Sequence, residues 1–453
     1  MHRADPGSFR DPASHIVFEG DRVLRLLDDR GLRGWEALSE SEFFARATRD
    51  GRLIESRAVE HRGEAAGALE HPPIPFISYP YEWTFSMLKD AALLQLDLLA
   101  EALSEGLTIK DATPDNIQFI EGRPVFIDIG SFEEYSAGEP WIGYRQFTRQ
   151  FLFPLMLRSH LGIPFQPWLR GNPDGPTAAE MQGLLPLWQR LKPSTLMHVS
   201  LQARMERRMA GTAVRGQLKT AGFSADLILA NVRKLRKLIA GLEWSGSGDG
   251  WIEYESCRHV GRDRDAKTEF LEDALAAHSP RRVLDLGAND GHFSVRAASG
   301  GAHAIAVDGD EPVLDALYRR RTGVSIALND LTNPSPSPGW AGRERPGLAE
   351  RARPDLVIAY GLIHHLIYTA SVPPAAVVDW LAGFGCAVVV EFVAPEDEMV
   401  TRLTANKIEA ELHPARTQAE FETQLTSHFD TVSTATLGEG TRVLYSLTPS
   451  LNE

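Results

Sequence analysis

The sequence predicts two domains, an α+β domain followed by an α/β domain whose sheet is mostly parallel. Three observations support this fold class. At about 150 residues per domain, the 453 residues suffice for two or three domains. The stretch Ser245–Gly250 (SGSGDG) has the small, flexible and acidic residues of a linker. After it, short β-branched strands alternate with helical stretches, which is typical of β-α units. We therefore place the domains at 1–244 and 245–453.

The amino-acid composition excludes several classes of protein. Hydrophobic residues make up 43% and charged residues 24%, which is ordinary for globular domains and excludes disorder or a collagen-like fibre. The 47 basic and 61 acidic residues give a net charge of −14, so nucleic acid is not expected as a partner. The two cysteines, Cys257 and Cys386, are too few for a disulfide framework or a multi-thiolate zinc site, and they fit the reducing cytoplasm. No secretory signal or membrane-spanning run is visible, so neither export nor a membrane partner is expected.

The second half alternates predicted strands and helices. The strands are apolar at nearly every position, as expected where both faces of a parallel sheet are buried. In chain order the predicted elements are strand 281–287, helix 294–299, strand 302–308, helix 312–321, strand 354–360, helix 377–381 and strand 386–392.

The first half has a different order of elements. Two hairpins are indicated by apolar runs that flank glycine-containing turns, and two helices by apolar residues at helical spacing. A largely helical region follows, interrupted only by the turn-rich sequence RGNPDGPT. The predicted elements are hairpin 15–27, helix 36–48, helix 85–103, hairpin 117–129 and the helical region 141–242.

The clearest binding signal is the turn VLDLGANDGHFS at Val283–Ser294. A buried strand leads into a turn that contains Gly287, which lets the backbone approach a ligand, and the helix after the turn has free N–H groups at its start. Asp285 stands near the strand end, where it can accept a hydrogen bond from a ligand. The next strand ends at Asp308, the position from which an acid binds a ribose diol.

Two kinds of cofactor compete for this turn. A dinucleotide site prefers the pattern G-x-G-x-x-G, which places a pyrophosphate at the helix N-terminus. Here Asp285 and Asp290 flank the turn, so a pyrophosphate would meet negative charge. A nucleoside that carries a positive charge, such as S-adenosylmethionine, fits the site better.

Residues 251 to about 448 resemble a class I S-adenosylmethionine-dependent methyltransferase. The resemblance implies a Rossmann-like fold with a seven-stranded, mostly parallel sheet. The glycine-rich motif of the family corresponds to Asp285, Gly287, Asn289 and Gly291, and its ribose-binding acid to Asp308. The resemblance further implies that Tyr254 and Lys267 help to close the cofactor pocket. It places Asp330 beside the adenine, with Asn329 or Leu331 flanking the ring, and Tyr360 and Gly361 at the border of the cofactor.

The methyl acceptor would face a loop after the fourth strand. The resemblance places His364 and His365 there, and a neutral imidazole can take the proton of a hydroxyl nucleophile; a polar loop packed under the sheet is the alternative. Glu391 at the end of the fifth strand is a further candidate base or orienting acid. Ligand clusters at metal spacing are absent from the sequence, so we expect metal-free catalysis that depends on positioning two reactants.

The first half carries a kinase-like pattern. Asp111 and Asn116 have the spacing of a kinase catalytic loop, and Asp128-Ile129-Gly130 stands where kinases have Asp-Phe-Gly. The resemblance implies that Asp111 orients a hydroxyl, while Asn116 and Asp128 hold Mg²⁺ beside ATP. However, the catalytic-loop histidine and the glycine-rich phosphate loop are missing. An active phosphotransferase, a non-catalytic kinase-like scaffold with a helical C-lobe, and a coincidental spacing all remain open.

A wider resemblance extends over nearly the whole chain. The segments Tyr79–Leu96 and Pro140–Leu157, together with the kinase-like stretch, resemble the N-terminal half of a group of large bacterial nodulation-type methyltransferases. We therefore expect a cytoplasmic bacterial enzyme that methylates a small-molecule or glycan acceptor, on oxygen by preference. One alternative is a bifunctional kinase-methyltransferase that uses Mg-ATP. A second is a non-enzymatic scaffold that binds S-adenosylmethionine.

Overall fold

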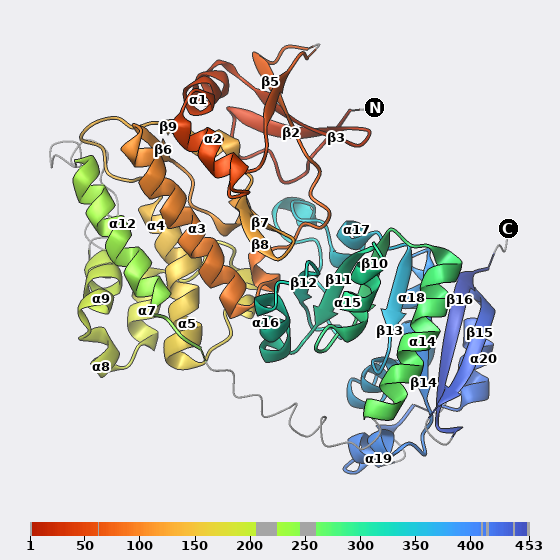
Figure 1. The fold of residues 1–453 in the computed structure, drawn as a ribbon. Helices are drawn as coiled ribbons and strands as arrows, with labels where there is room; N and C mark the ends of the chain where they lie inside the picture. Colours follow the sequence, from red (N-terminus) through yellow and green to blue (C-terminus); the bar gives the residue numbers. More distant parts are fainter. Residues whose placement is uncertain are drawn as a thin grey trace. The chain divides into compact units, whose positions relative to one another are not determined.

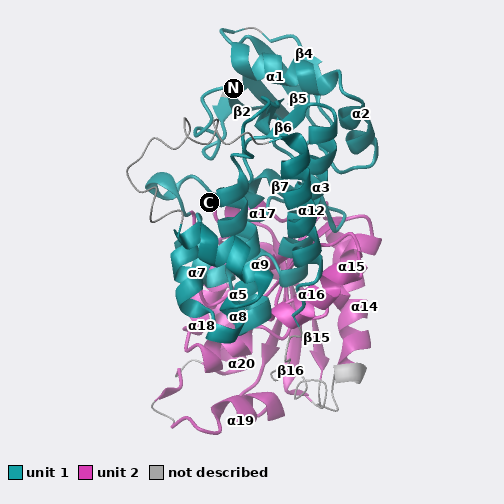
Figure 2. Cartoon of the chain, turned by 90° about the vertical axis from the view of Figure 1, so that its left-hand side faces the viewer, with its two compact units in different colours: residues 1–245, 338–345 teal, residues 246–337, 346–453 magenta. Residues whose placement is uncertain are grey.

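The chain forms two compact units. The computed structural model describes residues 2–61, 63–204, 224–244, 260–408, 411–413, 416–437 and 440–450. Unit 1 comprises residues 1–245 and 338–345, and unit 2 comprises residues 246–337 and 346–453 (Figure 2). The predicted linker segment lies outside the described residues, as do Tyr254 and Cys257.

Unit 2 is built on one seven-stranded sheet with the order β12-β11-β10-β13-β14-β16-β15. All neighbouring strands are parallel except at β16, which runs antiparallel to both β14 and β15. The predicted seven-stranded, mostly parallel sheet is therefore confirmed. The strands are β10 (Arg282–Leu286), β11 (His303–Asp308), β12 (Ser325–Leu328), β13 (Leu356–Ala359), β14 (Ala387–Val393), β15 (Phe429–Leu437) and β16 (Arg442–Pro449).

Helices cover both faces of this sheet. Figure 2 shows the strands of unit 2 between α14 and α15 on one side and α18 and α20 on the other. Because the chain builds outward from β10 to β12 and then returns to place β13 on the other side of β10, the strand order reverses between β10 and β13. Such a reversal opens a crevice at the carboxyl ends of the strands, where doubly wound proteins bind ligands. The helices are α14 (Val260–His278), α15 (His292–Ser299), α16 (Glu311–Arg319), α17 (Leu348–Ala352), α18 (Pro374–Ala382), α19 (Glu398–Thr404) and α20 (Gln418–Leu425).

Unit 1 begins with a five-stranded antiparallel sheet in the order β1-β2-β3-β5-β4. The predicted first hairpin is present as β2 and β3, joined at Gly20, which has a positive φ of 61°. The second hairpin is present as β7 and β8, and its turn residues Glu121 and Gly122 both have the positive φ that a tight hairpin requires. The strands are β1 (His2–Ala4), β2 (Ser14–Glu19), β3 (Arg22–Leu27), β4 (Arg57–Val59), β5 (Gly67–His71), β6 (Leu107–Ile109), β7 (Ile117–Ile120), β8 (Arg123–Phe126) and β9 (Phe132–Glu134).

The rest of unit 1 is helical and packs around α3 (Phe85–Ser104) (Figure 1). This helix is apolar almost all round, and it contacts α12, α5 and β8, so it forms the centre of the unit's core. Thr84 caps it by accepting a hydrogen bond from the Met87 N–H. The other helices after it are α4 (Tyr144–Phe147), α5 (Phe153–Leu161), α6 (Gln166–Gly171), α7 (Ala178–Leu184), α8 (Leu187–Arg190), α9 (Pro193–Thr195) and α12 (Ala225–Ala240), with π-helical turns η4 (Thr148–Leu152) and η5 (Leu196–Leu201).

One predicted helix is wrong in its bounds. The single helix predicted at 36–48 is two helices, α1 (Asp29–Ser39) and α2 (Glu42–Arg49). The break occurs because Ser41 is the N-cap of α2, and its Oγ accepts a hydrogen bond from the Phe44 N–H at 3.1 Å. Capping therefore overrides the continuous apolar spacing.

A short segment of the second half belongs to unit 1. Residues 338–345 follow β12 in the chain but cluster with residues 1–245. The Arg10 guanidinium donates two hydrogen bonds to the Glu344 carboxylate, at 2.9 and 2.7 Å. Arg345 forms an ion pair with Asp115 at 2.6 Å. Among the described residues, no helix combines the length and apolarity needed to cross a membrane.

Candidate functional site

The main cleft of unit 2 lies at the carboxyl ends of its parallel strands, at the strand-order reversal. Its volume is about 950 Å³, which is in the range of cofactor and small-molecule sites. Both charged and apolar side chains face it. The lining includes Asp263, Arg264, Lys267, Gly287, Asn289, Asp290, Phe293, Asp308, Arg320, Asp330, Leu331, Tyr360, Gly361, Leu362, His365, Asp397, Met399 and Arg442.

The turn after β10 has the backbone that its glycines require. Gly287 has a φ of 76°, and its N–H donates to the Val307 carbonyl of the neighbouring strand at 2.8 Å. Gly291 also has a φ of 76°, and a Cβ there would lie 2.4 Å from the Leu317 Cδ2 atom. Asn289 adopts a positive φ of 50° between them. The turn therefore packs tightly on one side while its other side faces the cleft.

Asp308 faces the cleft from the end of β11. One of its carboxylate oxygens accepts the Asn289 N–H at 2.8 Å, and the other accepts the Asp310 N–H at 2.9 Å. Burial raises the pKa of Asp308, while these backbone hydrogen bonds oppose the rise. The carboxylate is thus fixed in orientation by the backbone and keeps lone pairs directed at the cleft.

Asp285 stands one residue before the end of β10. It is buried in β10, it is not among the cleft-lining residues, and its Oδ2 accepts a hydrogen bond from the Ser294 hydroxyl at 2.6 Å. Burial raises its pKa to about 7. Its observed contact joins β10 to α15, so it fixes the start of that helix beside the turn.

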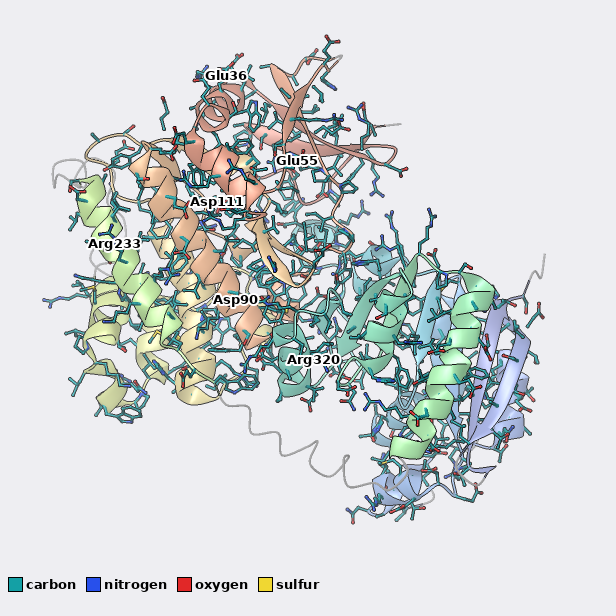
Figure 3. All side chains as sticks on the ribbon, viewed as in Figure 1. Glu36, Glu55, Asp90, Asp111, Arg233 and Arg320 are labelled. Carbon is teal, nitrogen blue, oxygen red and sulfur yellow. The ribbon has the colours of Figure 1, made fainter. Side chains whose placement is uncertain are left out.

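Asp290 occupies the N-terminus of α15. Its Oδ1 accepts the His292 N–H at 3.2 Å, and its Oδ2 pairs with the Arg264 guanidinium at 2.7 Å. Arg320, labelled in Figure 3, donates to the Asp290 carbonyl oxygen. The helix N-terminus that would bind a pyrophosphate therefore already holds a carboxylate of the chain itself. Asp290 was predicted to lie beside the turn. Arg264 and Arg320 were not predicted there, because their positions depend on α14 and α16.

The loop after β12 supplies the next wall of the cleft. Asp330 and Leu331 line it, and Asp330 Oδ1 accepts the Thr332 N–H at 2.9 Å in a local turn. Asn329 is buried and turned away, because its side chain exchanges hydrogen bonds with Ser335 at 2.6 and 3.0 Å. Asn329 therefore shapes this loop, and Leu331 is the apolar side chain offered to a ligand.

Glu391 lies at the centre of a buried charge cluster. The carboxylate is fully buried, and it accepts hydrogen bonds from Lys267 Nζ and from the Gly361 N–H, each at 2.7 Å. Arg442 reaches its other oxygen at 3.3 Å and also forms two hydrogen bonds to Asp397, each at 2.9 Å. Glu391 therefore holds two cations and the Gly361 backbone in place at the cleft wall. The role of Arg442 was not found from the sequence, because it stands 51 residues after Glu391.

Tyr360 and Phe293 form an aromatic wall of the cleft. Their rings meet edge to face with centroids 4.9 Å apart. The Tyr360 hydroxyl donates to the Lys267 carbonyl at 3.3 Å, and burial raises its pKa well above the ordinary value. Tyr360 is therefore a neutral wall residue. The predicted partner Tyr254 lies outside the described residues.

The two adjacent histidines have opposite environments. His365 begins the π-helical turn η7 (His365–Thr369) and lines the cleft, and its pKa is lowered by burial and by the nearby Arg442. His364 is fully buried on the other side, in a small pocket among Ile363, Ile367 and Phe392. Neither ring nitrogen of His364 has a hydrogen-bond partner among the described residues. Of the three candidate bases, only His365 faces the cleft with its ring available.

The kinase-like residues of unit 1 also come together. Asn116 Nδ2 donates to the Asp111 carbonyl at 3.4 Å and to Ser131 Oγ at 3.1 Å, and Ser131 in turn donates to Asp128. Asp111, labelled in Figure 3, has a raised pKa because of burial and because Asp128 is near. Asp128 is ion-paired with the Arg25 guanidinium at 2.7 Å.

Asp128 already has a cationic partner within the chain. Arg25 is buried on β3, and its guanidinium also donates to Ser14 Oγ at 3.0 Å. It supplies, from within the chain, the positive charge that a cation would bring to Asp128. Among the described residues, no group of three or more His, Cys, Asp or Glu side chains is suited to hold a metal ion.

A comparison with curated proteins places the chain in a family. It is 36% identical over 416 residues to the nodulation protein NoeA of Rhizobium meliloti strain 1021, which covers 88% of this chain and 87% of that protein. The chain belongs to the NoeA family. The predicted nodulation-type grouping is thus confirmed, and the matched length exceeds either unit, so the NoeA family shares both. No family model matches the sequence.

Solved structures resemble part of this NoeA-family chain. The N-methyltransferase NodS from Bradyrhizobium japonicum WM9, in complex with S-adenosyl-L-homocysteine, matches 46% of this chain and 94% of its own, with 14% identity and a TM-score of 0.32. Magnesium protoporphyrin IX methyltransferase from Synechocystis PCC 6803 matches 48% of this chain and 94% of its own, with 16% identity and a TM-score of 0.28. At these values the likenesses bear on neither the activity nor the substrate of this chain.

Proposed function

We propose that unit 2 binds S-adenosylmethionine and transfers its methyl group to a small-molecule or glycan acceptor, on oxygen. The observation that carries this proposal is the pair of carboxylates at the turn. Asp290 fills the helix N-terminus where a dinucleotide would place its pyrophosphate, while Asp308 turns its carboxylate to the cleft where a ribose would lie. The cleft thus suits a nucleoside without phosphates.

The charges of the cleft suit a cationic nucleoside. Three of its four cations are paired with carboxylates, Arg264 with Asp290, Lys267 with Glu391 and Arg442 with Asp397, and the fourth, Arg320, donates to the Asp290 carbonyl oxygen. By contrast, Asp263 Oδ2 has no hydrogen-bond partner among the described residues. The surplus of carboxylates would favour a ligand with a sulfonium and an ammonium group.

His365 is the base that this geometry favours. S-adenosylmethionine supplies the electrophilic methyl group. Because its pKa is lowered, His365 is neutral at pH 7 and can accept the proton of an acceptor hydroxyl, while the acceptor oxygen forms the new C–O bond and the sulfonium leaves as a neutral thioether. Leu362 and Met399 provide apolar surface beside it that excludes water.

The binding step is tested by titrating purified full-length protein with S-adenosylmethionine in a calorimeter. Asp308→Asn is expected to weaken binding by about 10- to 100-fold, because hydrogen bonds to a charged group contribute about 1.5–3 kcal/mol. Asp379→Asn, at an exposed hydrogen bond between α18 and His428, serves as the matched control and should bind like the wild type. If the wild-type protein binds neither S-adenosylmethionine nor S-adenosylhomocysteine, the proposal is wrong.

The transfer step is tested with methyl-labelled S-adenosylmethionine and fractions of a cell extract, with and without Mg-ATP. A labelled product that forms without ATP is expected. His365→Gln should lower its rate by about 10²- to 10⁴-fold while leaving S-adenosylmethionine affinity unchanged. Labelling that requires ATP would favour a bifunctional kinase-methyltransferase. The ion pair of Asp128 with Arg25 does not favour that alternative.

A further inference from the structure

Large apolar side chains are exposed together at one end of unit 1. They belong to α7, to α8 with its C-cap Leu191, and to η5, and both α7 and α8 contact η5, so the side chains come from neighbouring elements. Figures 1 and 2 both show α7, α8 and α9 side by side, at the end of the unit away from its β-sheet. Leu187, Trp188 and Leu191 are 75%, 61% and 78% exposed. The α8 patch, as we name it, comprises Leu184, Leu187, Trp188, Leu191, Leu196, Met197 and Leu201.

The charge of this segment is unlike that of the rest of the chain. The chain carries a net charge of −14, yet residues 181–204 contain no Asp or Glu and three cations, Arg190, Lys192 and Arg204. Lys192 is exposed and lies over the Trp188 ring, with its Nζ 5.1 Å from the centroid. A further cation, Lys234 on α12, lies close enough to lower the pKa of His198 in η5. Positive charge therefore borders the apolar side chains.

We propose that the α8 patch binds the surface of an anionic lipid bilayer. Interfacial attachment needs protruding apolar side chains with cations beside them, because the side chains enter the boundary of the acyl chains while the cations meet anionic headgroups. An aromatic ring with a polar edge, such as Trp188, is favoured at that boundary. Attachment of this kind needs no membrane-spanning helix, and none is found among the described residues.

A bilayer fits the patch better than a second copy of the chain does. In a symmetric dimer the patch would meet itself, so the cations of residues 181–204 would face like charges, and the nearest acid in the sequence, Glu180 of α7, is already hydrogen-bonded to Thr177. An anionic bilayer instead offers negative charge at every point of the contact. The apolar exposure is also concentrated, because seven large apolar side chains are exposed on three neighbouring helical elements.

The test is flotation of the full-length protein with vesicles of phosphatidylcholine alone or with about one third phosphatidylglycerol. Binding is expected on the anionic vesicles, and it should weaken as salt is raised, because screening reduces the attraction of the cations. The variant Leu187→Ser/Trp188→Ser/Leu191→Ser should lower the bound fraction by about tenfold. Lys192→Glu should lower it less and should also reduce its salt dependence.

The matched control is Phe9→Ser/Ile142→Ser/Val432→Ser, which removes three apolar side chains that are 50%, 48% and 53% exposed outside the patch. It should bind vesicles like the wild type, and circular dichroism should show that both triple variants are folded. The proposal is overturned if the wild type does not float with anionic vesicles at low salt, or if the control loses binding equally. A dimer in sedimentation that only the patch variant abolishes, without vesicle binding, would overturn it in favour of a second copy.

Discussion

The adjacent histidines His364 and His365 differ in which side of the cleft wall they face. His364 and His365 are adjacent, so the sequence offered both as bases, and no pattern separates them. Because helical residues turn by about 100° per position, neighbours point in different directions. His365 faces the cleft and His364 faces the apolar side chains behind it. Only packing, which a single sequence does not display, could assign them.

The buried His364 makes stability depend on pH. Its pKa is well below the ordinary value because of burial, with His365, Arg442 and Lys267 adding to the shift and Asp397 opposing it. In the unfolded chain the pKa is about 6.5, so below that pH the unfolded state takes up a proton that the folded state refuses. Stability is therefore present above pH 6.5 and is lost as the pH falls. Between pH 7 and pH 5 the free energy of unfolding of His364→Leu should fall by less than that of the wild type, the difference being at most about 2 kcal/mol.

Urea unfolding at a series of pH values measures this difference. His15→Leu is the control, because His15 is exposed on β2 and its removal should leave the pH profile of the wild type. Equal acid sensitivity in the His364→Leu variant and the wild type would show that His364 is not the group responsible.

Predictability from sequence differs among the site's acids. Asp308 could be placed because it ends a parallel strand, and strand ends meet at one edge of the sheet. Glu391 also ends an apolar run, but its partner Lys267 is 124 residues away, so its engagement with two cations could not be anticipated. Asp285 was predicted to bind a ligand, and its hydrogen bond from the Ser294 hydroxyl likewise could not be anticipated.

At the scale of elements, the turn between β10 and α15 depends on Gly291. Its φ of 76° and the contact with Leu317 both oppose a side chain. Gly291→Ala should therefore lower the free energy of unfolding by about 1–3 kcal/mol and weaken S-adenosylmethionine binding through the displaced turn. Gly183→Ala in α7, where a Cβ meets nothing within 4 Å, should instead stabilise by up to about 1 kcal/mol. Urea unfolding of both variants, with binding by calorimetry, provides the measurement; equal effects would contradict the argument.

The apolar parallel strands and the central helix of unit 1 were predictable, whereas other elements were not. The strands β10, β11, β13 and β14 and the helix α3 lie close to their predicted bounds, but β15, β16 and α14 had no prediction, because their sequences lack an equally apolar run. The strands β4, β6 and β9 contain three residues each, which is too few for a pattern to establish a period. They exist because a neighbouring strand completes their hydrogen bonds.

At the scale of the whole molecule, the chain order does not match the compact units. Residues 338–345 interrupt the sequence of unit 2 and belong to unit 1. No compositional change marks Arg345 as a partner of Asp115, because they are 230 residues apart. From the sequence we predicted two continuous domains with one boundary, because only one segment has the composition of a linker.

This crossing predicts a long-range energetic coupling. Arg345 is 13% exposed at its side chain and pairs with Asp115 at 2.6 Å, so Arg345→Met should destabilise unit 1 by leaving Asp115 without its partner. In a double-mutant cycle with Asp115→Asn, the two changes should couple by about 0.5–3 kcal/mol, because residues in direct contact are not additive. Arg343→Met, two residues earlier and exposed, is the control and should change stability by less than about 0.5 kcal/mol. Additive effects in urea unfolding of the full-length variants would mean that the segment gains no stability from this ion pair, and that its place in unit 1 depends on other contacts, such as those of Arg10 with Glu344.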